Sequence, residues 1–188
     1  MKVGTDGVLL GAWAGVRPAD RRILDVGTGT GLIALMMAQR APEALITGVD
    51  VEEVSQAREN AAASPWGGRV AFVQCPVQEF APDERFDLIV SNPPYVPQSD
   101  CAAMHVNVRD YEPPEALFVP DDDPLRFYRA IGRAARRLLR PDGRLWFEIY
   151  ERLADETARL LADEGFGDIA VRRDINDKPR ILCCTARK

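Results

Sequence analysis

The stretch ILDVGTGTGL, residues 23–32, decides the fold class of this chain of 188 residues. Its first four residues form a short apolar run that predicts a buried strand, and a segment with helical spacing follows from Leu32 to Arg40. Between them lies a loop with a glycine at every second position, where the backbone can turn tightly and approach a ligand closely. A strand, a glycine loop and a helix in this order predict the first unit of an alternating α/β fold.

The rest of the chain continues this alternation of apolar strands and amphipathic helices. Strands are expected at 23–26, 45–49, 70–73, 88–90, 144–149, 169–172 and 181–185. Helices are expected at 32–40, 52–63, 124–139 and 153–164. The pattern predicts one α/β domain over residues 1–188, with an open, mostly parallel, seven-stranded sheet and helices on both of its faces. In such sheets ligands bind at the carboxyl ends of the strands, near the point where the strand order reverses.

The overall composition indicates a cytoplasmic globular protein. Hydrophobic residues make up 46% of the chain and charged residues 28%, and no apolar run approaches the length of a membrane span. The net charge of −5 argues mildly against a protein that mainly grips a phosphate backbone. The four cysteines lack metal-ligand spacing and are expected as free thiols, and a single histidine excludes a multi-histidine site, so no metal is expected.

Two acidic residues flank the glycine loop and favour a nucleoside that carries an ammonium group. Asp25 shortly precedes Gly27, Gly29 and Gly31, and a carboxylate there would repel a pyrophosphate but can hold a cation. This argues against a dinucleotide. Asp50 ends the next strand, where it can accept hydrogen bonds from both hydroxyls of a ribose. Capping the following helix is a second role that remains open for Asp50.

The stretch SNPPY, residues 91–95, must end the apolar strand before it, because proline has no N–H for a sheet ladder. We expect a rigid, solvent-accessible corner that presents Asn92 and Tyr95. Asn92 Oδ1 and the Pro93 carbonyl can accept hydrogen bonds from both N–H groups of a planar nitrogen, which localises its lone pair for attack. Pro94 stiffens the turn, Tyr95 can stack on the flat substrate group, and no strong general base is required. A plain strand-ending turn is the alternative.

Together, the glycine loop, Asp50 and NPPY resemble the class I S-adenosylmethionine-dependent methyltransferases, over essentially the whole chain. The resemblance implies a Rossmann-like methyltransferase fold and S-adenosyl-L-methionine as the cofactor. It narrows the activity to methyl transfer onto a planar nitrogen of adenine, cytosine or glutamine. The catalytic residues that it implies are Asn92, Pro93, Pro94 and Tyr95. The cofactor-binding residues that it implies are Asp25, Gly27, Thr28, Gly29, Gly31, Asp50 and Asn92.

The two halves of the chain resemble different members of this group. Up to Tyr95, with MKVGTDGVLLGAWA and ENAAASPW, the chain is similar to bacterial methyltransferases that act on adenine N6 beside the anticodon of a valine tRNA. That resemblance places Thr5 beside the cofactor. From Tyr95 onward, NPPYVPQSD and DINDKPRILCC look like release-factor glutamine N5-methyltransferases, and by that resemblance Glu112 and Pro113 help to close the glutamine pocket. Both families carry an upstream segment or domain that we expect this chain to lack.

The residues after the third strand depart from both families. A polar or acidic side chain usually meets the cofactor adenine there, but this chain reads Gln74-Cys75-Pro76-Val77. The backbone N–H of Val77, or the side chain of Gln78, is expected to take over that contact.

The substrate remains open between two macromolecules, with a release-factor glutamine favoured and tRNA adenine as the alternative. Six arginines at spacings of three and four could grip RNA, although a solvated helix face is the default explanation. They are Arg126, Arg129, Arg133, Arg136, Arg137 and Arg140. A non-catalytic cofactor-binding subunit and an NAD-dependent oxidoreductase are further alternatives, against which the intact loop and NPPY argue.

Overall fold

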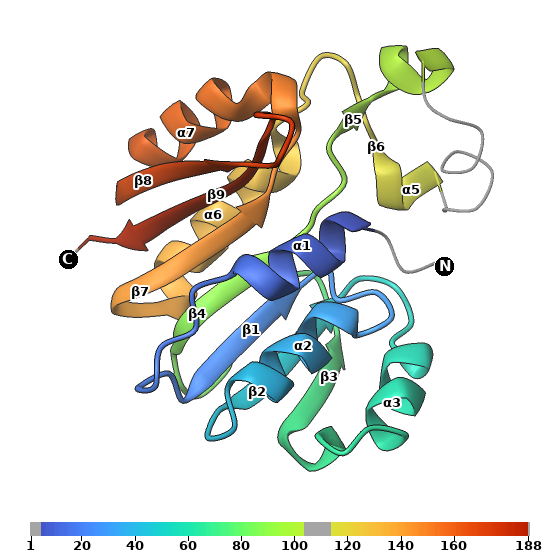
Figure 1. The fold of residues 1–188 in the computed structure, drawn as a ribbon, viewed down its shortest axis with the longest axis vertical. Coiled ribbons are helices and arrows are strands. Elements are labelled where there is room, and N and C mark those ends of the chain that lie inside the picture. The colour runs from blue at the N-terminus through green and yellow to red at the C-terminus, as the bar shows by residue number, and fades with distance from the viewer. Residues whose placement is uncertain (1–4, 104–113, 188) are drawn as a thin grey trace.

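A seven-stranded sheet runs through the middle of the molecule in the computed structural model, which describes residues 5–103 and 114–187 (Figure 1). Its strand order is β3-β2-β1-β4-β7-β9-β8. The strands are β1 (Arg22–Val26), β2 (Leu45–Asp50), β3 (Val70–Gln74), β4 (Phe86–Ser91), β7 (Leu139–Glu148), β8 (Phe166–Arg173) and β9 (Pro179–Ala186). The five strands from β3 to β7 are parallel, whereas β9 runs antiparallel to both β7 and β8. All seven expected strands are confirmed.

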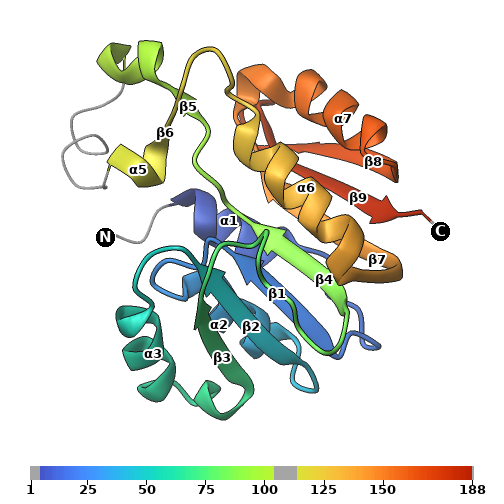
Figure 2. The ribbon, with the colours of Figure 1, turned by 180° about the vertical axis from the view of Figure 1, so that it is seen from behind.

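Helices cover both faces of the sheet and enclose two apolar cores (Figures 1 and 2). One core joins the sheet to α1 (Thr5–Trp13), α2 (Leu32–Arg40) and α3 (Ser55–Ala62). The other lies under α6 (Arg126–Leu138) and α7 (Ala154–Asp163), where Tyr128 and Phe147 meet edge to face. The expected α/β fold, a mostly parallel seven-stranded Rossmann-like sheet with helices on both faces, is therefore confirmed.

The helix α1 is the one long element that the sequence patterns did not predict. It packs across α2, and the approach is so close that a Cβ on Gly11 would lie 2.5 Å from Met36 Sδ. A Cβ on Gly7 would touch Leu32 and Ile33, the first residues of α2. Glycine thus lets α1 lie against the helix that follows the glycine loop.

The strand β7 begins earlier than expected. The sequence predicts a break at Pro141-Asp142-Gly143 and a strand from Arg144, but β7 already starts at Leu139. Leu139 pairs with Phe86, and the register then shifts before Leu88 pairs with Arg144. The expected turn therefore lies inside the strand as an irregularity, with Asp142 at a φ of 64°.

The segment after SNPPY contains a small second sheet. In this parallel pair, β5 (Val96–Pro97) lies beside β6 (Phe118–Val119). A short 3-10 helix, η2 (Gln98–Ala103), follows β5, and α5 (Pro114–Leu117) precedes β6. None of the helices in the described ranges is long and apolar enough to cross a membrane.

Candidate active site

The glycine loop and NPPY lie next to each other at the carboxyl edge of the sheet. The chain moves outward from β1 to β2 and β3, then returns to the other side of β1 as β4. The strand order therefore reverses between β1 and β4, which is where ligands bind in open parallel sheets. The loop leaves the end of β1 and NPPY leaves the end of β4, and Val26 pairs with Ser91 at this edge.

The loop is held open by left-handed glycines. Gly27, Gly29 and Gly31 have φ values of 72°, 53° and 80°, a region that favours glycine. A Cβ on Gly27 would meet nothing within 4 Å, whereas one on Gly31 would lie 2.9 Å from the Phe72 ring. Gly27 therefore borders open space in which a ligand can approach the backbone, and Gly31 is required for packing.

Asp25 is completely buried and uses only one of its carboxyl oxygens within the protein. Its Oδ2 accepts hydrogen bonds from Thr28 Oγ1 at 2.7 Å and from the backbone N–H of Ala34 at 3.1 Å. Its Oδ1 is buried and has no hydrogen-bond partner among the described residues. Burial raises the pKa of Asp25 to about 7, although the bonds from Thr28 and Ala34 act in the opposite direction. The buried Thr28 hydroxyl is thus turned toward Asp25 and fixes the loop.

Asp50 ends β2 and ties the glycine loop to the neighbouring strand. Its Oδ2 accepts a hydrogen bond from the backbone N–H of Gly29 at 2.8 Å, and its Oδ1 accepts one from that of Glu52 at 3.1 Å. The alternative that Asp50 caps the next helix is wrong, because α3 begins only at Ser55 with Val54 as its N-cap. Each carboxylate oxygen has further lone pairs, so Asp50 can still accept hydrogen bonds from a ribose.

Three further sequence candidates lie around this loop. Thr5 is exposed in the first turn of α1, two residues before Gly7, which packs against the first residues of α2. The side chain of Val77 lies in the core under α6, and its carbonyl accepts a hydrogen bond from Arg137 at 3.1 Å. The backbone N–H of Val77 is therefore the group that remains a candidate for the adenine contact. The side chain of Gln78 is exposed.

The SNPPY corner is more enclosed than the sequence suggests. Ser91 is completely buried, and its hydroxyl donates a hydrogen bond to the Val26 carbonyl at 2.7 Å, which joins the ends of β4 and β1. Asn92 and Tyr95 are half-buried rather than fully solvent-accessible. The Tyr95 ring is stacked on Tyr150, with centroids 5.8 Å apart. One face of Tyr95 is thus occupied, and a substrate group can stack only on the other.

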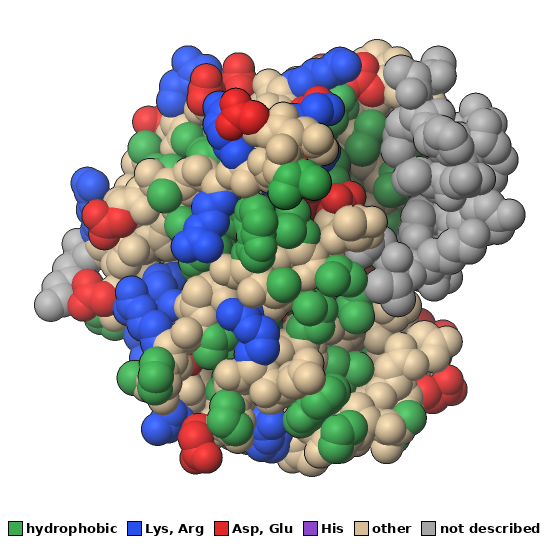
Figure 3. Space-filling view, viewed as in Figure 1, with side chains coloured by type: hydrophobic (Ala, Val, Ile, Leu, Met, Phe, Trp, Pro, Cys, Tyr) green, Lys and Arg blue, Asp and Glu red, His purple; other side chains and the backbone are tan. Residues whose placement is uncertain are grey.

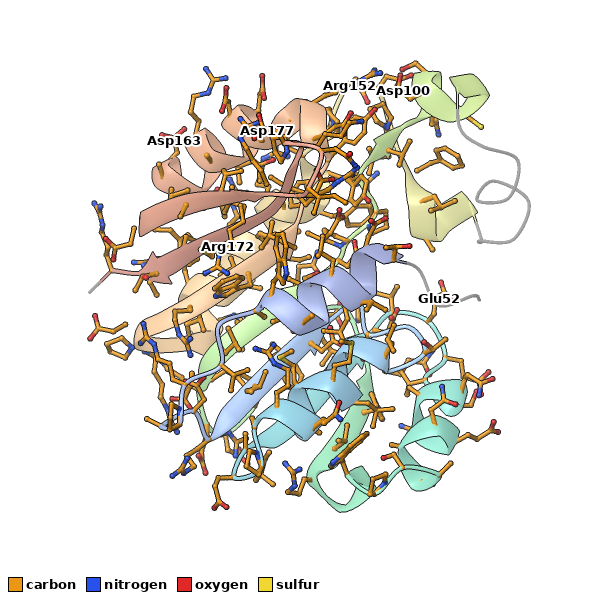
Figure 4. All side chains as sticks on the ribbon, in the orientation of Figure 1. Glu52, Asp100, Arg152, Asp163, Arg172 and Asp177 are labelled. Carbon is orange, nitrogen blue, oxygen red and sulfur yellow. The ribbon has the colours of Figure 1, made fainter. Side chains whose placement is uncertain are left out.

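The segment after NPPY is anchored to the residues that follow β7. Tyr150 donates a hydrogen bond to Asp100 in η2, and Arg152 approaches the same carboxylate at 3.3 Å (Figure 4). Burial and the Asp100 contact together raise the pKa of Tyr150 to about 12. The neighbouring backbone N–H of Ser99 binds Asp121 Oδ1 at 2.9 Å. These contacts hold the wall of the site on which Tyr95 is stacked.

A buried acid at this edge was not singled out in the sequence. Glu148 is the last residue of β7 and is completely buried. Ser91 pairs with Phe147, so Glu148 and Asn92 lie one step further along adjacent strands. The signal in the sequence was an acid at the end of the apolar run 144–149. Glu112 and Pro113, expected in the substrate pocket, lie outside the described residues.

The six arginines expected on one helix are mostly bound within the protein, but Arg140 lies in β7 because α6 ends at Leu138. Arg137 donates to the carbonyls of Val77, Gln78 and Phe80, and Arg140 binds Asp87 at 2.8 Å. The remaining four have these contacts: Arg129 with Asp123, Arg133 with Glu164, Arg136 with the Arg187 carbonyl, and Arg126 over the Phe127 ring. Arg126, Arg133, Arg136 and Arg137 are exposed, as expected for a solvated helix face, although most of the six arginines also contact other parts of the chain.

Comparisons with known proteins agree with this geometry. Residues 8–108 match the family described as Methyltransferase small domain. The chain is 41% identical over 169 residues to a release factor glutamine methyltransferase of Bacteroides thetaiotaomicron, which covers 88% of this chain and 60% of that protein. It is 40% identical over 198 residues to a tRNA1(Val) (adenine(37)-N6)-methyltransferase of Yersinia enterocolitica, which covers 100% of this chain and 74% of that protein.

The fold is also that of solved methyltransferases. A 1,6-didemethyltoxoflavin-N1-methyltransferase of Burkholderia thailandensis, solved with bound S-adenosylhomocysteine, matches with a TM-score of 0.62 and 21% identity. The match covers 97% of this chain and 77% of that structure. The glycine loop and the end of β4 both fall inside the residues matched by the family, and the chain belongs to the Methyltransferase small domain family.

Proposed function

We propose that this protein transfers a methyl group from S-adenosyl-L-methionine to a planar nitrogen, with the side-chain amide of a release-factor glutamine as the substrate. The observation that carries the proposal is the position of the glycine loop and NPPY at one sheet edge, on either side of the strand-order reversal. The relatives named for methyl transfer are longer than this chain, so activity and substrate are both part of the proposal.

The residues of the loop fit a nucleoside cofactor that carries an ammonium group. The unpartnered, buried Asp25 Oδ1 is an acceptor for a charged donor, and the open space at Gly27 allows close approach to the backbone. Asp50 would accept the ribose hydroxyls, with Thr28, Gly29 and Gly31 shaping the loop and the Val77 N–H near the adenine. When bound, the cofactor supplies an electrophilic methyl group on a positively charged sulfur.

The residues of NPPY prepare the nitrogen for attack. Asn92 Oδ1 and the Pro93 carbonyl accept hydrogen bonds from its two N–H groups, which draws the nitrogen out of conjugation. The two proline rings hold this backbone in one shape, so the acceptors need no rearrangement as the reaction proceeds. The free face of Tyr95 supports the flat group, since Tyr150 holds the other face. Glu112 and Pro113 are proposed to close the substrate pocket.

Two observations favour a protein substrate over RNA. The arginines between residues 126 and 140, the best candidates for phosphate contacts, are mostly engaged with carboxylates and carbonyls of the same chain. On the face that carries α1, basic and acidic side chains are scattered together and form no single basic patch (Figure 3). A protein that grips RNA usually presents such a patch.

Methylation of adenine N6 in a valine tRNA is the second candidate. It is favoured by the similarity to the relative from Yersinia enterocolitica, which extends over the whole of this chain. The NPPY chemistry is the same for both substrates, because an adenine amino group and a glutamine amide are both planar nitrogens with two N–H groups.

Methyl transfer to both substrates side by side tests the proposal. A release factor and unmodified valine tRNA are each incubated with the protein and S-adenosylmethionine labelled in the methyl group. We expect incorporation into the release factor and not into the tRNA. Incorporation of label into the tRNA alone would show that tRNA, and not the release factor, is the substrate. Incorporation into neither would overturn the proposed methyltransferase activity.

A further inference from the structure

Glu148 is a buried acid at the site to which the proposed reaction gives no role. Its side chain is completely buried, and neither Oε1 nor Oε2 has a hydrogen-bond partner among residues 5–103 and 114–187. A buried carboxyl without partners is costly for a fold. Such a cost is expected where the group serves a ligand.

The register of the sheet places Glu148 beside Asn92. The last paired residues of β4 and β7 are Ser91 and Phe147, so Asn92 and Glu148 follow at the same level of the sheet edge. Side chains alternate along a strand, so Glu148 lies on the same face as Trp146, the face that packs under α1 and its connection to β1. The carboxyl therefore shares this edge with the amide that holds the substrate nitrogen.

Three groups from different parts of the chain act on the Glu148 carboxyl. Burial and then Asp6, in the first turn of α1, raise its pKa well above the usual value, whereas Tyr95 and Arg180 lower it. The Tyr95 hydroxyl faces the carboxyl, although no hydrogen bond of normal geometry joins them. Tyr128 donates to the backbone carbonyl of Glu148 instead, at 3.3 Å.

Arg180 cannot act as a dedicated counter-ion for Glu148. This arginine from β9 binds Asp174 at 3.0 Å and approaches Glu151 at 3.6 Å. Its charge is therefore shared with two other carboxylates. Burial and Asp6 therefore outweigh Tyr95 and Arg180, and the pKa of Glu148 stays well above its usual value.

We propose that Glu148 accepts the proton that the substrate nitrogen sheds during methyl transfer. The inference rests on the proposed function. The nitrogen lone pair forms the new N–C bond, and the pair of the C–S bond stays on the sulfur. The pair of one N–H bond returns to the nitrogen as its proton passes to a Glu148 oxygen.

The charges in the pocket agree with this assignment. A sulfonium in a buried site attracts a negative charge, so cofactor binding favours the ionised form of Glu148. After transfer the sulfur is a neutral thioether and Glu148 carries the proton, so both groups lose their charge together. The net charge of this pair therefore does not change, because the proton leaves the nitrogen as the sulfonium charge disappears.

Proton release on cofactor binding tests this role without any methyl transfer. Calorimetry near neutral pH in two buffers with different heats of ionisation counts the protons released. We expect binding of S-adenosylmethionine to release more protons than binding of S-adenosylhomocysteine, because only the former carries the sulfonium. Glu148→Gln should abolish this difference while still binding S-adenosylhomocysteine, since the amide is neutral and has nearly the same shape. The matched control Glu164→Gln, which alters a glutamate paired with Arg133 at the end of α7, should keep the difference.

Single-turnover transfer tests the chemical step. The rate of the wild-type protein should rise with pH as Glu148 ionises, whereas Glu148→Gln should be slower by about 100-fold or more and lose that rise. Glu148→Asp, which keeps the carboxyl, should restore part of the rate. A Glu148→Gln variant with the wild-type rate and proton release would overturn the role of Glu148 alone. A wild-type protein that methylates neither substrate would instead overturn the proposed function, and the proton counts would still report on Glu148.

Discussion

Asp25 combines two tasks in one buried side chain. Its Oδ2 fastens the glycine loop to the start of α2 through Thr28 and Ala34, while its Oδ1 stays without a partner among the described residues. The fold therefore buries a carboxyl group of which only one oxygen is hydrogen-bonded, which is unfavourable for stability. We interpret the unused oxygen as the position for a charged donor on the cofactor.

This arrangement predicts how stability changes with pH. The pKa of Asp25 is about 7 in the folded protein and near the ordinary 3.8 in the unfolded chain, so between these values the folded state holds the extra proton. The protonation of Asp25 contributes its full amount to the free energy of unfolding below about pH 4, and this contribution is lost as the pH rises toward 7. Asp25→Asn removes this titration. Between pH 4 and 7 its free energy of unfolding should therefore fall less than that of the wild type, by up to about 4 kcal/mol.

Urea denaturation of both proteins across this pH range measures the effect. In the same variant, binding of S-adenosylmethionine should weaken by about 1.5–3 kcal/mol, the typical contribution of a hydrogen bond to a charged group. Stability curves that run parallel in the two proteins would show that Asp25 is ionised in the fold at acidic pH.

Asn92 should matter far more for chemistry than for cofactor binding. Its amide oxygen is needed mainly as the nitrogen changes shape, so Asn92→Ala should lower kcat by about 100-fold or more. The Kd for S-adenosylhomocysteine, measured by calorimetry, should stay unchanged. If the variant retained more than about a tenth of the wild-type kcat, the role given to Asn92 would be wrong.

At the scale of elements, one side chain of α6, Arg137, makes several hydrogen bonds to the loop after β3. Arg137 donates hydrogen bonds to three carbonyls at 77–80, two of them in partly buried positions. Arg133 on the same helix makes one ion pair with Glu164 and is 65% exposed. The two arginines look alike in the sequence, but their contacts indicate that they contribute differently to the stability of the fold.

Replacing each arginine by alanine measures how much each contributes to the free energy of unfolding. Arg137→Ala leaves several carbonyls without their donor and should lower the free energy of unfolding by about 1–3 kcal/mol. Arg133→Ala removes only an exposed ion pair and should cost about 0.2–1 kcal/mol. Urea denaturation at neutral pH provides both values, and equal losses in the two variants would contradict the account of α6.

The elements also differ in how well their sequences predict them. The run 23–26 and the glycines after it predict β1 and its loop correctly, because both apolar patterning and backbone freedom are local properties. The helix α1 is missed because TDGVLLGAW has no polar face and contains two glycines, which are used for packing against α2. Glu148 is missed because its importance depends on the register between β4 and β7, which only the assembled sheet defines.

At the scale of the whole molecule, charge should distinguish the two substrates. If the protein acts on a release factor, replacing Arg133 should leave the salt dependence of substrate binding unchanged. If it acts on tRNA, binding should weaken steeply and log-linearly with salt, and the loss of a phosphate contact should reduce the slope by about one. Binding titrations at several salt concentrations, with the wild type and Arg133→Ala, decide between these outcomes.

The central claim is that the Asn92 to Tyr95 corner transfers a methyl group to a planar nitrogen beside the bound cofactor. The most direct measurement is peptide mapping by mass spectrometry of a release factor incubated with S-adenosylmethionine and either the wild-type protein or Asn92→Ala. We predict a single added methyl group on one glutamine side chain with the wild type and almost none with the variant. Methylation of a different kind of residue, or equal methylation by the variant, would contradict the account.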